Sequence, residues 1–369
     1  MSELYIGLMS GTSLDGIDGV LADFSDSRMV VTHHASAPFA PDLRAELLAL
    51  NTSGSDELHR AALAGNGLTR AYAGVVKKLL ERSGLASSAI RAIGAHGQTV
   101  RHRPQEFDGT GYTLQLGNPS LLAERTGIAV VADFRSRDLA AGGQGAPLVP
   151  AFHQGVFGRN GETMLVLNIG GISNLSVLGA DGQVLGFDCG PGNALMDYWC
   201  QLHTGQAFDA SGAWAASGQV LPELLVLLRQ EPFLHKAPPK STGRDLFNPG
   251  WLANRLDAFR SAAPQDVQAT LTEFTALACA EDARRHGAGA ATLAVCGGGA
   301  LNDHLMARLQ AACPALQIVA TDALGLPALQ VEAAAFAWLA RQAVRGQPGN
   351  LPSVTGAAGG RVLGAIYPA

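Results

Sequence analysis

Three short loops rich in glycine and small polar residues each follow an apolar stretch of the chain. They read MSGTSLDGID (9–18), NIGGISN (168–174) and CGGGALN (296–302). Glycines let backbone N–H groups close around an anion, and hydroxyls and amides add donors. Asp15 and Asp18 in the first loop would repel phosphates unless they face a cation or its waters, as in Mg²⁺ sites. A hairpin with Asx-turns explains the first loop alone equally well, but three such loops together favour a nucleotide site.

The third loop differs from the other two because it follows a buried strand and opens a helix near Asn302. Its bare backbone would let a flat group such as adenine lie against it, and an ordinary strand-to-helix turn rarely needs three glycines. Neither GxxxxGK[ST] nor a complete GxGxxG occurs, so P-loop and Rossmann interpretations lack their motif.

Two carboxylates stand where an element begins or ends. Asp188, within FDCGPGN (187–193), ends a strand before a helix, where it could act as a general base; the alternative is a turn or N-cap aspartate. Glu332 opens an alanine-rich helix. It is a candidate second carboxylate or a first-turn charge that the helix dipole favours.

Polar residues follow two further strands. His96, Gln98 and Thr99 share one turn and suit hydrogen bonds to sugar hydroxyls or an amide, whereas zinc ligation lacks a cysteine partner. Arg135 or Arg137 could hold a substrate carboxylate through a bidentate fork. For either arginine alone, a surface ion pair is the better explanation.

The elements that must position these residues form one pattern that occurs twice. Apolar runs at 4–9, 19–24 and 29–32 predict a β-meander, and runs at 164–169, 175–178 and 184–187 predict a second one. We interpret them as one supersecondary unit in two similar lobes. Further strands are expected at 92–95, 128–133, 293–296, 318–320 and 361–367, and helices at 42–51, 56–83, 194–204, 221–229, 249–260, 265–286 (amphipathic) and 331–344.

Length and composition agree with a two-lobed α/β protein. The chain of 369 residues exceeds the single-core limit of roughly 250–300 residues. We expect an N-terminal lobe of 1–125 plus 345–369 and a C-terminal lobe of 126–344. The strand at 361–367 would return to the first lobe.

The charge balance and cysteine usage exclude several classes of protein. The net charge of −5 provides no basic footprint for nucleic acid. No apolar stretch reaches the length of about 18 residues of a membrane span, and the N-terminus does not read as a signal peptide. Five widely spaced cysteines indicate neither a disulfide framework nor zinc. We expect a cytoplasmic protein without membrane or nucleic-acid partners.

Taken together, these segments resemble the anhydro-N-acetylmuramic acid kinases. The matching stretches span nearly the whole chain in the family's order: MSGTSLDGID (9–18), HGQTVRHRP (96–104), ADFRSRDLAAGGQGAPLVP (132–150), NIGGISNL (168–175), FDCGPGNALMD (187–197), CGGGALN (296–302) and the segment around Glu332. One departure is Cys189, where the family more often has threonine. A hydroxyl contact is therefore in doubt, but the neighbouring carboxylate is retained.

The resemblance implies an actin-like, ribonuclease H-like ATPase fold with two lobes and an interlobe cleft. It implies that 1,6-anhydro-N-acetylmuramic acid, ATP and water give N-acetylmuramic acid 6-phosphate and ADP, in the recycling of cell-wall amino sugars. It further implies Mg²⁺ as a cofactor and a homodimer.

Applied residue by residue, the resemblance predicts four groups of site residues. The catalytic pair would be Asp188 and Glu332. The nucleotide would contact Gly11, Thr12, Ser13, Leu14, Asp15, Gly16, Ile17, Asp18, Asn168, Gly170, Gly171, Asn174, Gly297, Gly298, Gly299 and Asn302. The sugar would lie near His96, Gln98, Thr99, Arg135 and Arg137. Asp15 and Asp18 would serve the metal, directly or through water.

Three other functions fit parts of the pattern. An ordinary hexose kinase of the same superfamily would need no attack of water at carbon 1. A non-enzymatic ATP switch would not need the polar segments around His96 and Asp188. A sugar-sensing repressor would need a DNA-binding helix-turn-helix, for which the sequence offers no room before the first strand.

Overall fold

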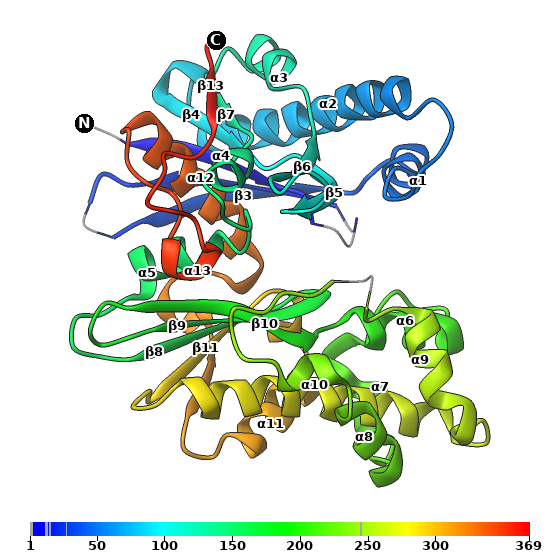
Figure 1. Cartoon of the computed structure of the whole chain (residues 1–369). Coiled ribbons are helices and arrows are strands. Elements are labelled where there is room, and N and C mark those ends of the chain that lie inside the picture. Colours follow the sequence, from blue (N-terminus) through cyan, green and yellow to red (C-terminus); the bar gives the residue numbers. More distant parts are fainter. Residues whose placement is uncertain (1–2, 12–13, 15, 27, 244–245) are drawn as a thin grey trace. The chain divides into compact units, whose positions relative to one another are not determined.

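The computed structural model describes residues 3–11, 14, 16–26, 28–243 and 246–369. They divide into two compact units, each of which contains both strands and helices (Figure 1). Unit 1 comprises Met1–Val156 and Gln330–Ala369, and unit 2 comprises Phe157–Leu329. Three predicted nucleotide contacts, Thr12, Ser13 and Asp15, lie outside the described residues.

Unit 1 is built on a six-stranded sheet of order β13-β7-β4-β1-β2-β3. Its strands are β1 (Leu4–Met9), β2 (Ile17–Asp23), β3 (Val30–Ala37), β4 (Ile90–Ala95), β7 (Val130–Ala132) and β13 (Ala365–Tyr367). β1 to β3 form the predicted antiparallel meander, while β4 is parallel to β1. β13 pairs with β7, so the C-terminal strand is part of the unit 1 sheet. A separate ribbon of β5 (Gln98–Pro104) and β6 (Gly111–Leu116) completes its strands.

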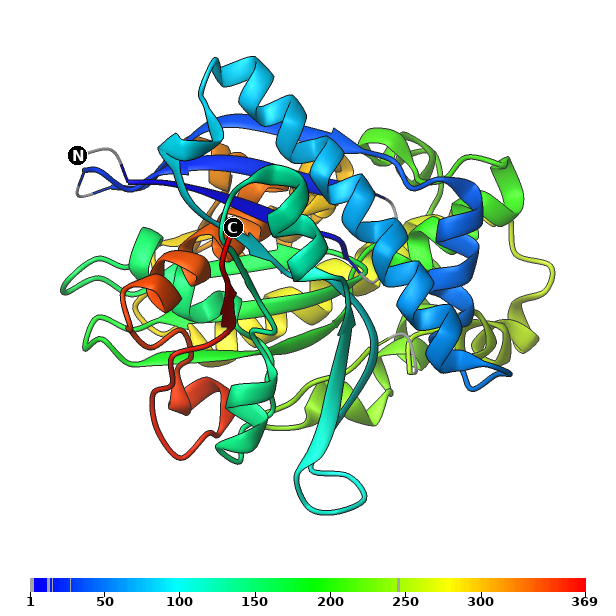
Figure 2. The same ribbon diagram turned by 90° about the horizontal axis from the view of Figure 1, so that it is seen from above.

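Alternating apolar residues give the unit 1 sheet two buried faces. Ile6 and Leu8 of β1 pack in one cluster with residues of α2 (Glu57–Ser83), and Tyr5 packs in another with residues of α12 (Val331–Val344). Side chains of a strand point alternately to opposite faces, so one strand serves both cores. Seen from above, α2 lies across the strands of the meander (Figure 2).

Two glycines bring α12 into backbone contact with the sheet. Gly7 and Gly94 are paired across β1 and β4. A Cβ atom on Gly7 would collide with the carbonyl oxygen of Ala333, and one on Gly94 would collide with that of Phe336. The alanine-rich composition of this helix therefore reflects a close helix–sheet approach, which larger side chains would prevent.

Unit 2 repeats the same strand order around a five-stranded sheet, β10-β9-β8-β11-β12. Its strands are β8 (Met164–Ile169), β9 (Ile172–Leu178), β10 (Val184–Pro191), β11 (Thr292–Cys296) and β12 (Gln317–Ala320). β8 to β10 form an antiparallel meander, and β11 is parallel to β8, as β4 is to β1. This repeat confirms the predicted duplication and the two-lobed, ribonuclease H-like α/β class of the actin-like fold.

The helices complete both units. Unit 1 also contains α1 (Pro41–Ala49), α3 (Pro119–Thr126), α4 (Ser136–Ala140) and α13 (Pro352–Thr355), and α5 (Val149–Phe157) ends at the boundary with unit 2. Unit 2 contains α6 (Ala194–Thr204), α7 (Ala213–Ala216), α8 (Pro222–Arg229), α9 (Pro249–Leu256), α10 (Pro264–His286) and α11 (Asp303–Ala312). The amphipathic interpretation of residues 265–286 was wrong, because most of α10 is buried and the buried residues include Thr272 and Asp282. None of the helices in the described part of the chain could cross a membrane.

The units divide the chain at positions other than those expected. Residues 126–156 and 330–344, expected in the C-terminal lobe, lie in unit 1. The reason is hydrogen bonding and packing that loop signals do not reveal. β7 pairs with β4, and α12 packs on β1 although it follows unit 2 in the chain.

Candidate functional site

In unit 1, the loop after β1 is tied to the turn after β4. Ser10 Oγ donates to the carbonyl oxygen of Gly97 at 3.1 Å, and Gln98 Nε2 donates to that of Gly11 at 3.1 Å. Leu14 and Ile17 are buried in the core of the unit. If this loop holds phosphate groups, these two residues can contribute only their backbone, while their side chains anchor the loop.

In unit 1, the buried His96 contacts the partly buried Arg135, and the charge of Glu332 acts on that arginine. His96 Nε2 lies 2.9 Å from Arg135 Nη2, and Arg135 Nη1 donates to the carbonyl oxygen of Gly145 at 2.8 Å. The His96 ring also packs on Phe336, with 4.6 Å between the ring centroids. Phe336 lies one helical turn beyond Glu332 at the start of α12, so the helix that carries Glu332 also supports the histidine.

Burial sets the charge of these groups. Burial, together with the nearby Arg135 charge, lowers the pKa of His96 to about 3. The imidazole is therefore neutral at physiological pH, and Nε2 accepts from the arginine. Burial lowers the pKa of Arg135 to about 10, so it remains a cation. Burial also raises the pKa of Glu332; Arg135 opposes that shift, and Asp18 adds to it.

Three buried polar atoms of this region have no hydrogen-bond partner among the described residues: His96 Nδ1, Gln98 Oε1 and Arg135 Nε. Buried polar groups are normally satisfied, because an unmade hydrogen bond is costly. Nδ1 of His96 carries the proton if Nε2 accepts from Arg135. The group thus offers two N–H donors and one amide oxygen, a set that matches the hydroxyl and amide groups of an amino sugar.

The structure brings some of the predicted residues into this group and leaves others apart. Thr99 Oγ1 accepts from Gln115 Nε2 at 3.2 Å. Asp18 is 44% exposed and pairs with His34 Nε2 at 3.1 Å. Arg137 is exposed on α4, and none of the described contacts of the His96 group involves it.

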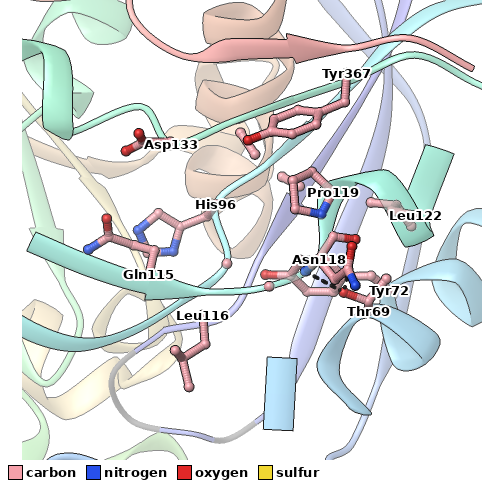
Figure 3. A pocket seen from close by; sticks show the side chains of 14 residues that line it. Thr69, Tyr72, His96, Gln115, Leu116, Asn118, Pro119, Leu122, Asp133 and Tyr367 are labelled. Atoms are coloured by element: carbon pink, nitrogen blue, oxygen red, sulfur yellow. Dashed lines mark hydrogen bonds between the residues drawn. The ribbon is translucent and has the colours of Figure 1, made fainter. Parts of the chain in front are cut away.

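A pocket of about 180 Å³ lies beside His96 in unit 1. Figure 3 shows His96, Gln115 and Asp133 along one side of it, with Asn118 and Tyr72 across from them. Tyr72 and Asn118, on the far side of this pocket, were not predicted from the sequence. The Asn118–Pro119 pair could have revealed this side, because asparagine followed by proline is typical of a helix start, and Asn118 does cap α3.

In unit 2, polar side chains cross one end of the meander in a row. Asn174 of β9 is paired with Asn168 of β8 on one side and with Asp188 of β10 on the other. Directly opposite residues of antiparallel strands share a face. The three predicted residues therefore lie together, and Asn168 Oδ1 is buried without a partner among the described residues.

Glycines pack the loops of unit 2 against each other. Asn193, which the sequence reasoning missed, donates from its backbone to the Gly170 carbonyl at 2.7 Å and from Nδ2 to that of Ile169 at 3.1 Å. A Cβ atom on Gly297 would collide with Asn168 Oδ1, and one on Gly299 would collide with Ile169. The β8–β9 loop at 170–171, the turn after β10 at 192–193 and the glycine loop at 297–299 thus lie in close contact.

Asn302 has a structural task. Its side chain accepts from the backbone N–H of Leu305 at 3.0 Å and so caps α11. A nucleotide contact through this side chain would compete with the cap. Gly298, by contrast, has only the Asn193 side chain near the position of its missing Cβ.

Asp188 is held by a neighbouring segment, residues 240–242. Its backbone N–H donates to the carbonyl oxygen of Lys240 at 3.0 Å, and its Oδ2 accepts from the backbone N–H of Thr242 at 2.9 Å. Burial raises the pKa of Asp188 to about 6, against the opposing influence of the Thr242 hydrogen bond and the Lys240 charge. A carboxylate with this pKa is largely ionised at neutral pH and still basic enough to accept a proton.

The comparisons with known proteins agree over the full chain. The family described as anhydro-N-acetylmuramic acid kinase matches residues 3–369. Proteins of that name from Variovorax paradoxus (strain S110) and Albidiferax ferrireducens are 69% and 62% identical and are covered over 99% and 100% of their lengths, with 100% of this chain in each alignment. A ROK family glucokinase from Streptomyces griseus, solved with glucose and AMPPNP, is 14% identical with a TM-score of 0.41 over 92% of this chain and 99% of that chain. At this similarity the fold assignment depends on the sheet topology itself.

Proposed function

This chain belongs to the anhydro-N-acetylmuramic acid kinase family and is an ATP-dependent kinase of that kind, and we propose that its two units divide the chemistry. Unit 1 binds and polarises the sugar and supplies the phosphate loop at 11–18, and unit 2 supplies the base and the other nucleotide contacts. The observation that carries this proposal is the placement of Asp188 in one row with Asn168 and Asn174, where the Thr242 N–H holds its carboxylate; its raised pKa of about 6 suits a general base.

The reaction joins a hydrolysis to a phosphoryl transfer. Asp188 takes a proton from a water molecule as the water oxygen bonds to C1 of 1,6-anhydro-N-acetylmuramic acid. The C1–O6 bond breaks, and O6 takes the γ-phosphoryl group of ATP with release of ADP. Both steps depend mainly on positioning and on electrostatic stabilisation.

Unit 1 provides the sugar contacts in this scheme. The Nδ1–H of His96 and the Nε–H of Arg135 donate to sugar oxygens, and the Oε1 of Gln98 accepts from a hydroxyl or amide; these are the unpartnered atoms. Glu332 orients the sugar or the water. Burial raises the pKa of Glu332, and the charge of Arg135 opposes that shift.

Unit 2 provides a cradle suited to a nucleotide. The backbone at Gly170 and Gly171 and the side chain of Asn168 face the phosphates, and Gly297 to Gly299 receive the nucleoside. The tight approach of Asn168 and Ile169 to Gly297 leaves no room for a side chain at residue 297, so this glycine lets the loops pack closely.

Mg²⁺ fits the residues that are described. Mg²⁺ commonly uses one or two protein carboxylates and takes its other ligands from waters and phosphates. Asp18 offers one partly exposed carboxylate, while Asp15 lies outside the described residues. No cluster of three His, Cys, Asp or Glu residues occurs in the described part of the chain, so phosphates would complete the shell. The bound ion would offset the negative charge of the β- and γ-phosphates.

The proposal also covers the protein's cellular location, oligomeric state and physiological role. Membership of this family implies a cytoplasmic homodimer that recycles cell-wall amino sugars.

Labelled water distinguishes this reaction from that of an ordinary hexose kinase. In ¹⁸O water, the anhydro-sugar and MgATP should give a 6-phosphate product that carries one ¹⁸O at C1 and none in the phosphoryl group. Because a free C1 hydroxyl exchanges slowly with water, a control with unlabelled product in ¹⁸O water sets the background. Label at the background level would rule out attack of water at C1, and absence of sugar-stimulated ADP release would rule out the kinase itself.

A further inference from the structure

A buried lysine lies behind the segment that holds Asp188. The side chains of Lys240 and Asp282 are only 1% and 3% exposed, and Lys240 Nζ lies 2.9 Å from Asp282 Oδ2. Nζ also donates to the carbonyl oxygen of Leu234 at 3.3 Å. Ionic groups are costly to bury, so this pair needs an explanation that the sugar and nucleotide contacts do not supply.

The lysine is enclosed by aromatic rings as well. Its Nζ lies 5.5 Å from the centre of the Phe187 ring and 5.3 Å from that of Phe233. Phe187 precedes Asp188 in β10, and Asp282 lies on α10. Lys240 therefore reaches from the edge of the sheet into the core between β10 and α10, where cation–π contacts and the ion pair fix its position.

The backbone of the same segment closes the free edge of the sheet. β10 is the last strand of the unit 2 sheet, and the Lys240 carbonyl accepts from the Asp188 N–H. Two residues later, the Thr242 N–H donates to the Asp188 carboxylate. The side chain of Lys240 thus anchors a segment whose backbone hydrogen-bonds Asp188 on both its main chain and its carboxylate.

We infer that Lys240, through its buried ion pair with Asp282, is a positioning residue that fixes the orientation of the Asp188 carboxylate for proton abstraction. This inference depends on the proposed role of Asp188. An anchor inside the core suits a general base because small displacements of a reacting group are costly, on the order of 10²-fold for about 1 Å. Lys240 does not contact substrate in this scheme.

The charge of Lys240 also acts on the base. Together with the Thr242 N–H, it holds the pKa of Asp188 lower than burial alone would. The other titratable groups around the ion pair are Arg285 and His286 on α10 and the thiols of Cys189 and Cys279. These groups remain in variants of the pair. Removal of the anchor should therefore raise the pKa of Asp188 further and move the acid limb of kcat/KM to higher pH.

The test replaces both partners so that no buried charge is left alone. The double variant Lys240→Met/Asp282→Leu should fold, because well-packed apolar pairs can replace buried ion pairs. Its kcat should fall on the order of 10- to 100-fold, with an unchanged KM for ATP and an acid limb at higher pH than in the parent. The single variant Lys240→Arg, which keeps the charge, should retain more of the parent's activity than the double variant does.

A matched control separates positioning from general destabilisation. Glu273→Gln/Arg308→Gln removes an ion pair of 2.5 Å between the same helix α10 and α11, without touching residues 240–242. It should lower the melting temperature but leave the acid limb in place. If the first double variant does not fold, Asp282→Asn takes its place; kcat should again fall because the anchor is lost, but the acid limb should not move to higher pH, because Lys240 keeps the charge that lowers the pKa of Asp188.

Two outcomes separate this inference from the proposal on which it depends. Near-normal turnover of Asp188→Asn would overturn the role of Asp188 itself. If Asp188→Asn is inactive while the Lys240 variants keep the parent's kcat and acid limb, Lys240 is a structural residue only and the inference is wrong. A shift of the acid limb in the Glu273/Arg308 control equal to that in the Lys240 variants would also overturn it.

Discussion

Units 1 and 2 share a strand order but place their carboxylates in different ways. In unit 1 the row across the end of the meander is Met9, Asp18 and Ser36, and the buried carboxylate, Glu332, comes from a helix behind the sheet. In unit 2 a row near the same end of the meander contains Asn168, Asn174 and Asp188, so there the carboxylate is part of the sheet itself. The same framework thus supports two independent ways to hold an acidic group.

The packing behind the two sheets explains this difference. Gly7 and Gly94 face each other across β1 and β4, and Leu167 and Val295 do so across β8 and β11. The glycines admit the backbone of α12 and so bring Glu332 near the sheet, whereas the larger residues of unit 2 fill that space with side chains. In unit 1 the position of the carboxylate depends on helix–sheet contact, and in unit 2 it depends on strand register and the segment at 240–242.

The largest expected effect is the loss of the base in unit 2. Asp188→Asn should lower kcat by roughly 10²–10⁴-fold, the range for removal of a general acid–base group. The KM for ATP should hardly change, because the amide keeps the shape of the carboxylate. Steady-state kinetics would measure both constants. Asp181→Asn, in the exposed β9–β10 turn, is the control and should be fully active.

A smaller effect is expected from a methyl group at the helix–sheet contact of unit 1. Gly7→Ala should destabilise the protein by about 1–3 kcal/mol, as overpacking usually does, because the new Cβ meets the Ala333 carbonyl. It should also lower kcat, since Ala333 follows Glu332 directly. Thermal and urea unfolding would measure the loss.

The control for this substitution is Gly74→Ala on α2, where a Cβ would have nothing within 4 Å. It should stabilise by roughly 0.4–1 kcal/mol, because alanine restricts the unfolded chain more than glycine does. Equal stability of Gly7→Ala and the parent would contradict the close contact between Gly7 and α12. Full activity of a destabilised Gly7→Ala would mean that the function of Glu332 does not depend on that contact.

The sequence predicted most elements because local signals were strong. The helix at 331–344 has the predicted bounds, since an apolar, alanine-rich stretch ends near Gly346. The units could not be delimited in the same way. α12 joins unit 1 through contact with Gly7, a residue more than three hundred positions earlier in the chain, and no local pattern encodes such a partner.

The candidate site was predictable where side chains carry evident chemistry and not where they act through others. The sequence indicates Asp188, His96 and Arg135 by residue type and by their position at or just after the end of a predicted strand. Lys240 did not, because a lysine in a loop reads as a solvated charge and only the structure shows it buried against Asp282. Asn302, by contrast, reads equally well as a ligand contact or a helix cap, and the structure uses it as a cap.

A third expected effect tests whether unit 2 retains an unfavourable charge for function. The pKa of Asp188 rises from 3.8 to about 6 on folding, mainly through burial. A raised carboxylate pKa means that ionisation opposes folding. This cost is fully present above about pH 6 and disappears below the unfolded value of 3.8. Asp188→Asn removes the charge and should raise the melting temperature at pH 8.

The gain in melting temperature should shrink as the pH falls through 6 and vanish below 4, where the parent carboxyl is protonated in both states. Thermal unfolding at pH 8, 6 and 4 would measure it. The exposed Asp181→Asn variant, which has no such burial, should show no comparable gain. A gain in melting temperature that is the same at every pH would mean that it comes from packing. Burial of the Asp188 charge would then not be a cost of the arrangement in unit 2.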